Sequence, residues 1–156
     1  MAGPKITSAG PVDQVFALTN SDPVTIVPPG QAAPLPGTTL AIHLNLPSLL
    51  VISFDARVFG LTSTATKTNG PFLALNCNFD GTPCEPNVNS IEDYAVPGFG
   101  HSQSFTWIVH NAKAGAHKVE IIATAINFGS GAGLIEEIDV TNRTLTVFAA
   151  RIERTK

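Results

Sequence analysis

Two cysteines, Cys77 and Cys84, are the residues whose spacing most directly suggests chemistry, and they flank the dipeptide Asp80-Gly81. This dipeptide is typical of a two-residue hairpin turn of type I′, which needs φ > 0 at both positions. Such a turn would place Cys77 opposite Cys84 in a hydrogen-bonded pair, within reach of a disulfide. We therefore expect a disulfide that stabilises the fold by about 2–3 kcal/mol, with two reduced thiols as the alternative. An oxidised pair favours an extracellular or virion-surface location.

Metal-binding patterns are sparse in this sequence. The two cysteines have no close histidine to complete a zinc site, and their spacing is not the C-x-x-C of redox motifs. Glu136, Glu137 and Asp139 follow a glycine-rich segment and could supply oxygen ligands to calcium, but they lack the ligand spacing of a dedicated calcium loop. They are weak calcium candidates, and no metal site or cofactor is predicted. The four histidines fall in different expected strands or strand ends: His43, His101, His110 and His117.

The segment 85–101 is the candidate ligand-binding loop. It is long for a hairpin connection, and loops beyond about 12–15 residues are often functional. Tyr94 and Phe99 stand among polar groups in this loop, and His101 ends it. This mixture suits stacking on a sugar or docking of a protein, so these three residues are predicted to bind a ligand. The alternative is that both aromatic side chains close the end of the fold.

One short motif could indicate a catalytic nucleophile. The sequence "GHSQS" at residues 100–104 resembles the Gly-x-Ser-x-Gly nucleophile elbow around Ser102. That elbow needs a strand before the serine and a helix after it. Here a loop rich in proline and glycine precedes the serine and the strand-like "SFTWIV" follows. The context is inverted, so no catalytic residue is assigned and the protein is predicted not to be an enzyme.

Composition bears on the possible partners. The net charge is −3 and no run of lysine or arginine is present, so no nucleic-acid partner is predicted. No apolar run reaches the ~18 residues of a membrane span, and the N-terminus lacks the pattern of a signal peptide. Charged residues make up 13% of the chain, against about 25% in ordinary soluble domains. A chain with so few charges often hides part of its surface against partners.

Hydrophobic residues alternate with period two in most of the chain, and no helical period is sustained. Short alternating segments separated by turn residues predict an all-β fold, an antiparallel β-sandwich. We expect a single domain over residues 1–156, with an N-terminal arm at 1–21 and the sandwich core at 22–153. The expected strands are 24–28, 39–46, 49–59, 72–79, 102–109, 117–126 and 144–152.

Several expected strands are apolar on both faces. Val51 and Phe59 lie opposite the inward face of their strand, and Ile122 and Ile126 lie opposite the inward face of theirs. An antiparallel sheet with one face in water should alternate cleanly, and the sequence offers no helix to cover a second face. Another copy of the chain is therefore the expected cover, in a closed homo-oligomer. The alternative is that these are ordinary exposed hydrophobic residues.

The segments "PSLLVISFDARV", "NCNFDGTPCEP" and "SFTWIVHNAKAGAHKVEIIATA", followed by "RTLTVFAARI", resemble jelly-roll domains of the tumour-necrosis-factor-like type from bacteria and phages. The resemblance covers about residues 22–153. It implies a jelly roll that forms a homotrimer through apolar sheet faces, and it carries over no catalytic residue. The expected function is a non-enzymatic structural or adhesive module on a virion, filament or cell surface. The alternative function is a lectin-like domain that binds carbohydrate through the 85–101 loop.

Overall fold

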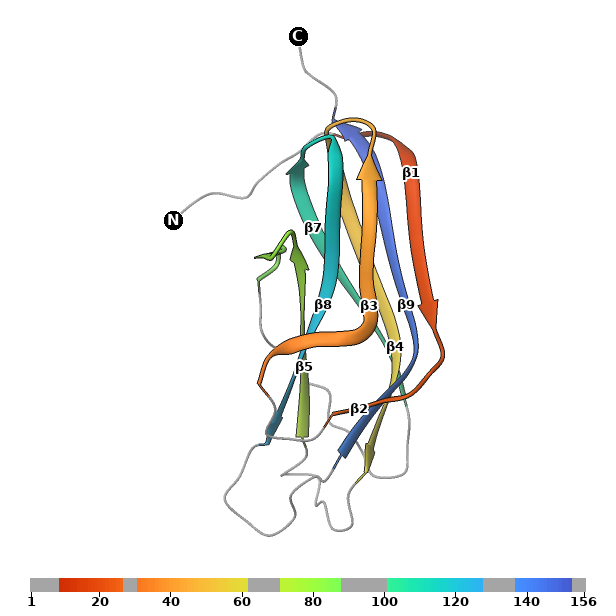
Figure 1. Ribbon diagram of the computed structural model, residues 1–156, viewed down its shortest axis with the longest axis vertical. Coiled ribbons are helices and arrows are strands. Elements are labelled where there is room, and N and C mark those ends of the chain that lie inside the picture. Colours follow the sequence, from red (N-terminus) through yellow and green to blue (C-terminus); the bar gives the residue numbers. More distant parts are fainter. Residues whose placement is uncertain (1–8, 27–30, 62–70, 88–100, 128–136, 153–156) are drawn as a thin grey trace.

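The computed structural model describes residues 9–26, 31–61, 71–87, 101–127 and 137–152. Within these ranges the secondary structure consists of β-strands and turns (Figure 1). No helix in the described ranges is long and apolar enough to cross a membrane. The strands are β1 (Ala9–Asn20), β2 (Val24–Ile26), β3 (Ala33–Leu44), β4 (Ser48–Leu61), β5 (Pro71–Phe79), β6 (Thr82–Pro83), β7 (His101–Ala112), β8 (Gly115–Asn127) and β9 (Glu137–Ile152).

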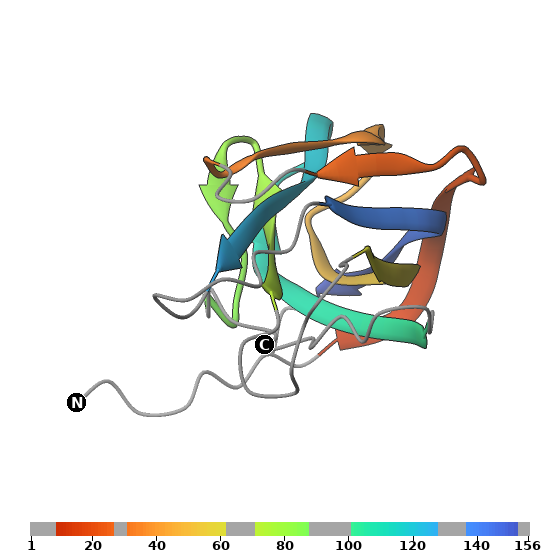
Figure 2. The same ribbon diagram turned by 90° about the horizontal axis from the view of Figure 1, so that it is seen from below.

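The strands form two antiparallel sheets. The first has the order β1-β9-β4-β7, with β2 also paired to β9, and the second has the order β3-β8-β5-β6. From β3 to β9 the chain passes from one sheet to the other at each connection except the β5–β6 hairpin, so neighbours in a sheet come from distant parts of the sequence. Seen from the end of the strands, the two sheets enclose a common interior (Figure 2). This arrangement confirms the predicted all-β antiparallel sandwich of jelly-roll type.

Alternation of side chains builds the interior. On β4 the side chains of Leu50, Ile52 and Phe54 are fully buried, while Asp55 and Arg57 are exposed on the other face. The inward residues of β8 are buried in the same way, as the period-two pattern predicts. The buried side chains with the largest volumes include Trp107, Phe54, Leu35, Leu44, Leu50 and Ile52. The core therefore draws on both sheets and on most strands.

The N-terminal boundary predicted from the sequence needs a correction. Ala9–Asn20, which falls inside the expected arm at 1–21, is strand β1 at the edge of the first sheet. It pairs with β9 from Val15↔Phe148 to Asn20↔Arg143. Apolar residues face both sides of this strand, with Phe16 against the core and Val15 exposed, so the alternation is hidden in the sequence. The sandwich therefore begins well before residue 22.

Candidate functional site

The hairpin that joins β5 to β6 has the predicted turn and register. Asp80 and Gly81 both have positive φ, at 50° and 79°, as a type I′ turn requires. Asn78 pairs with Pro83 and Phe79 pairs with Thr82. The Cys84 backbone N–H donates a hydrogen bond of 2.8 Å to the Cys77 carbonyl. The turn therefore sets the two cysteines opposite each other, as the sequence predicts.

The two cysteine side chains meet as free thiols. Their sulfur atoms are 3.5 Å apart and share a thiol hydrogen bond, whereas a disulfide bond is about 2.05 Å long. Both side chains are buried. The hydrogen bond that the Cys77 thiol shares with Cys84, together with burial, raises the pKa of Cys77 far above its ordinary value. Cys77 is thus held in the protonated form, and the disulfide expected from the sequence is absent from this structure.

Asp80, at the tip of the hairpin, contacts His117 and Lys118 near the start of β8, and we call this set of contacts the Asp80–His117 anchor. Asp80 Oδ2 lies 2.7 Å from His117 Nδ1, and Asp80 Oδ1 accepts a 2.8 Å hydrogen bond from the Lys118 backbone N–H. His117 Nε2 lies 2.7 Å from the Lys113 carbonyl oxygen, and the imidazole ring stacks on Phe79 with centroids 4.7 Å apart. Both partners of the imidazole are acceptors, so the ring donates to both only when each nitrogen carries a proton. This anchor therefore favours protonated His117.

The Asp80–His117 anchor should make stability depend on pH. Burial of His117 opposes protonation, but its hydrogen bonds to Asp80 and Lys113 outweigh burial and raise its pKa above 6.5. Burial likewise opposes ionisation of Asp80, but its bonds with His117 and Lys118 lower the Asp80 pKa below 3.8. The stabilisation that protonated His117 adds to the folded state is complete below pH 6.5, and it is lost as pH rises through the raised pKa of His117. The Asp80 contribution is complete above pH 3.8 and is lost as pH falls through the lowered pKa.

Urea unfolding at a series of pH values would check this dependence. We expect the wild-type free energy of unfolding to decline as pH rises above 6.5, and the decline to shrink in His117→Gln. His43→Gln is the matched control, because His43 is an exposed histidine on the neighbouring strand β3. Equal pH profiles for the wild type and His117→Gln would contradict the assignment.

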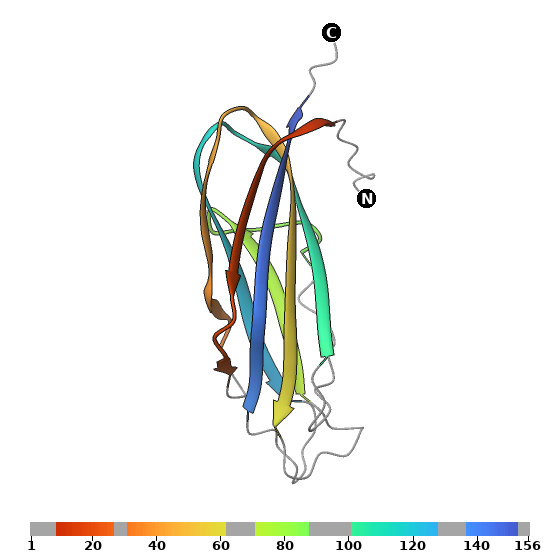
Figure 3. The same ribbon diagram turned by 90° about the vertical axis from the view of Figure 1, so that its right-hand side faces the viewer.

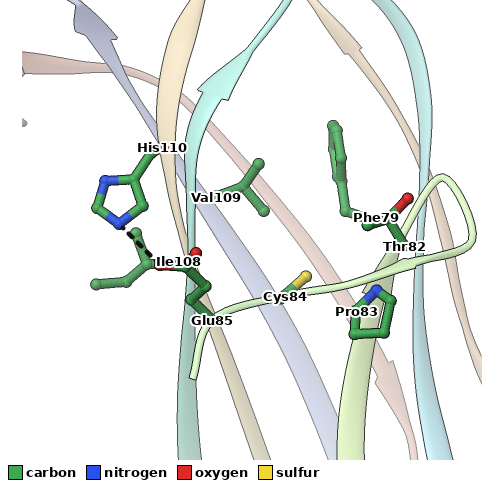
Figure 4. Close-up of a pocket in the computed structure, with 8 residues that line it drawn as sticks. All are labelled: Phe79, Thr82, Pro83, Cys84, Glu85, Ile108, Val109 and His110. Carbon is green, nitrogen blue, oxygen red and sulfur yellow. Dashed lines mark ion pairs between the residues drawn. The ribbon is translucent and has the colours of Figure 1, made fainter. Parts of the chain in front are cut away.

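The same hairpin closes one side of the sandwich against β7. Glu85 and Ile108 exchange two backbone hydrogen bonds, with N···O distances of 3.2 and 2.6 Å. The Glu85 carboxylate also lies 3.5 Å from His110 Nε2 (Figure 4). A pocket of about 150 Å³ lies between the hairpin and β7, and Cys84 is among its lining residues. The sulfur of Cys84 points away from the His110 ring in Figure 4, so these two residues do not form a nucleophile–base pair.

The ligand-binding and calcium predictions fall largely outside the described residues. Tyr94, Phe99 and Glu136 lie outside them, and the structure describes the backbone but not the side chains of His101 and Glu137. Asp139, on β9, accepts a 2.6 Å hydrogen bond from the Thr25 hydroxyl and so ties β2 to β9. Within the described ranges, no group of three histidine, cysteine, aspartate or glutamate side chains could hold a metal ion. The ligand-binding and calcium assignments stay predictions.

A buried arginine on β9 is a feature that the sequence does not predict. Asn142 has a positive φ of 47°, next to an irregularity in the pairing of β9 with β4. Arg143 follows it and is only 2% exposed, and its Nη1 donates a 2.8 Å hydrogen bond to the Val140 carbonyl. Burial lowers the pKa of Arg143, while the charge of Asp22 acts in the opposite direction. The sequence carries no signal for this arrangement, because the bulge that turns the side chain inward depends on the pairing with β4.

The same bulge borders a polar hollow on the outer side of the first sheet. The hollow has a volume of about 380 Å³, and its lining includes Asp55, Arg57 and Asn142. Ser102, the serine of the elbow-like motif, is also in the lining and lies on strand β7. The serine is therefore part of an extended strand, unlike the sharp strand-to-helix turn that presents the nucleophile in an elbow.

Solved structures of infectious bursal disease virus contain proteins with a similar architecture. The fold matches a protein in the structure of the Gt strain of infectious bursal disease virus, with a TM-score of 0.60 and 13% identity, over 99% of this chain and 42% of that one. It also matches the VP2 subviral particle of the same virus, with a TM-score of 0.58 and 15% identity, over 96% of this chain and 36% of that one.

At these identities the likeness is one of fold. The chain spans about two fifths of the length of these viral proteins. They support the jelly-roll fold but not specifically the tumour-necrosis-factor-like type suggested by the sequence. No protein-family model matches the sequence, and no curated protein matches it either.

Proposed function

We propose that this chain is a non-enzymatic structural module that assembles with copies of itself at the surface of a virion. The observation that carries the proposal is the match of almost the whole chain to proteins of infectious bursal disease virus, one of them in the VP2 subviral particle. The low content of charged residues supports it, since self-assembly covers surface that would otherwise be solvated. The proposed partners are other copies of the chain and further virion proteins.

A homotrimer is the proposed form of the assembly. It comes from the tumour-necrosis-factor-like resemblance of the sequence and from the apolar residues on the outer faces of the strands. Val51, Phe59 and Ile122 are each half-buried on those faces in the single chain. A neighbouring subunit that covered them would remove further apolar area from water, worth about 25 cal/mol per Å² before the costs of association.

Light scattering coupled to size exclusion tests the proposal. We expect a mass about three times the 16.3 kDa of one chain. The mass should be the same with and without reductant, because both cysteines belong to one hairpin. A single-chain mass at every concentration would contradict self-assembly, and a stable oligomer of another size would contradict only the trimer.

The carbohydrate-binding alternative rests on Tyr94 and Phe99, which lie outside the described residues. A glycan array tests it directly. Binding that is lost in Tyr94→Ala or Phe99→Ala would favour the lectin, and silence of the wild type across the array would count against it.

A further inference from the structure

The outer face of the first sheet, the side directed away from β3, β8 and β5, carries an apolar row that crosses four strands. Residues directly opposite each other in an antiparallel pair lie on the same face of the sheet. Val15 pairs with Phe148, Phe148 with Val51, and Val51 with Ile108. Figure 3 shows the four strands β1, β9, β4 and β7 side by side. The row therefore spans the whole width of the sheet.

Exposed apolar side chains concentrate on this face. Among the described residues, the exposed large hydrophobic side chains are Val12, Val15, Leu46 and Phe148, at 54%, 56%, 40% and 38% exposure. Val15 and Phe148 belong to the row, and Val12 pairs with Ala150 one step further along the same face. A side chain as large as phenylalanine at the middle of a sheet is unusual when the face is only in contact with water. This distribution indicates a surface that another molecule covers.

On the side of the apolar row that leads toward Asn20, the next two rows of the face are uncharged apart from one aspartate. Ala17, Thr146, Ser53 and Thr106 form the row beside Phe148. Thr19, Thr144, Asp55 and Ser104 form the row after it. The nearest cationic side chain along β4 is Arg57, which lies over the Phe59 ring at 4.7 Å. A face with so few charges meets little like-charge repulsion from a charge-poor surface, so it does not call for a partner of strong opposite charge.

The size of the face fits a protein–protein contact. Residues 48–58 of β4 pair with strands on both sides, a length of about 36 Å at ~3.3 Å per residue. Four strands at a spacing of ~4.8 Å give a width of about 19 Å, and thus a flat area of roughly 700 Å². A stable interface buries about 800 Å² on each partner. The face alone supplies nearly that amount.

We infer that the outer face of the first sheet, centred on Phe148, is where a second copy of this chain binds. The inference rests on the proposed self-assembly and adds the surface through which it occurs. A second copy suits the apolar row and the nearly neutral threonine and serine rows, because the charge-poor chain can present a surface of the same character. Face-to-face packing of sheets at about 10 Å also buries side chains such as Phe148 between the layers.

Aspartate substitutions test the surface. We expect Phe148→Asp and, separately, Val15→Asp to weaken self-association at least about thirty-fold, the factor that corresponds to an interface hot spot. Leu46→Asp is the matched control: Leu46 is as exposed as Phe148 but lies between β3 and β4, outside the four strands of the face. It should leave the mass unchanged. The mass is measured by light scattering over a concentration series, and circular dichroism confirms that each variant is folded.

The outcomes separate this inference from the proposed function. Suppose that the wild type is oligomeric and that the Phe148→Asp and Val15→Asp variants are folded and keep its mass. The assignment of the binding surface is then wrong, while the proposed self-assembly stands. If the wild type has the mass of a single chain at every concentration, both are wrong. Val15 lies on the edge strand β1 and is more exposed than Phe148, so its variant decides the question if Phe148→Asp fails to fold.

Discussion

Replacing Trp107 with alanine lowers the free energy of unfolding by about 3–5 kcal/mol, the usual cost of removing a large aromatic side chain from a core. Trp107 is only 2% exposed and is the largest of the fully buried side chains. It lies on β7 opposite Ile52 of β4, and its ring is tilted against Phe105 with centroids 6.2 Å apart. Natural domains are stable by only about 5–15 kcal/mol. This single change should therefore remove a large part of the total stability.

Ser102→Ala is the control for this substitution, since Ser102 lies on the same strand and is exposed. It should change stability by less than about 0.5 kcal/mol. Unfolding in urea is followed by circular dichroism, because Trp107 is the only tryptophan and its fluorescence is lost in the variant. A loss below about 1 kcal/mol for Trp107→Ala would contradict the placement of this side chain in the core.

Local signals make the strands and one turn predictable from the sequence. The alternation of Leu50, Ile52 and Phe54 depends only on neighbours along the chain, so the inward face of β4 can be assigned from residue order alone. The dipeptide Asp80-Gly81 specifies a turn type, and the turn type specifies which residues pair. For this reason the register of the β5–β6 hairpin is predictable residue by residue.

Contacts between distant segments are not predictable in this way. The side chain of Asp80 meets His117, which is 37 residues away, and a sequence pattern cannot specify such a pair. Strand β1 resembles part of an arm in the sequence because Val15 and Phe16 are apolar on opposite faces and hide the alternation. The outward apolar residues can be recognised in the sequence, but their alignment into one row through Phe148 depends on the order β1-β9-β4-β7. The apolar row on the outer face of the first sheet therefore depends on the strand order, which the sequence does not reveal.

Oxidation of Cys77 and Cys84 to a disulfide is expected to raise the free energy of unfolding by about 2.5 kcal/mol, as expected for a loop of about eight residues. The free thiols already face each other with sulfur atoms 3.5 Å apart, so little of the chain has to move. Formation of the bond requires a thiolate, which the raised pKa of Cys77 disfavours in the folded protein. We therefore expect oxidation during refolding with oxidised glutathione. The two thiols lose two electrons and two protons, and one molecule of oxidised glutathione accepts them and becomes two molecules of reduced glutathione.

Intact mass after alkylation under denaturing conditions measures the oxidation, and urea unfolding of the refolded protein with and without reductant measures its effect on stability. The double variant Cys77→Ala/Cys84→Ala is the control, because its stability should not respond to reductant. If both thiols of the wild type can still be alkylated after oxidative refolding, the prediction of a disulfide is wrong. The two cysteines then serve only as small apolar side chains, which fits their burial in the core. In that case their position opposite each other follows from the turn alone and has no bearing on where the protein resides.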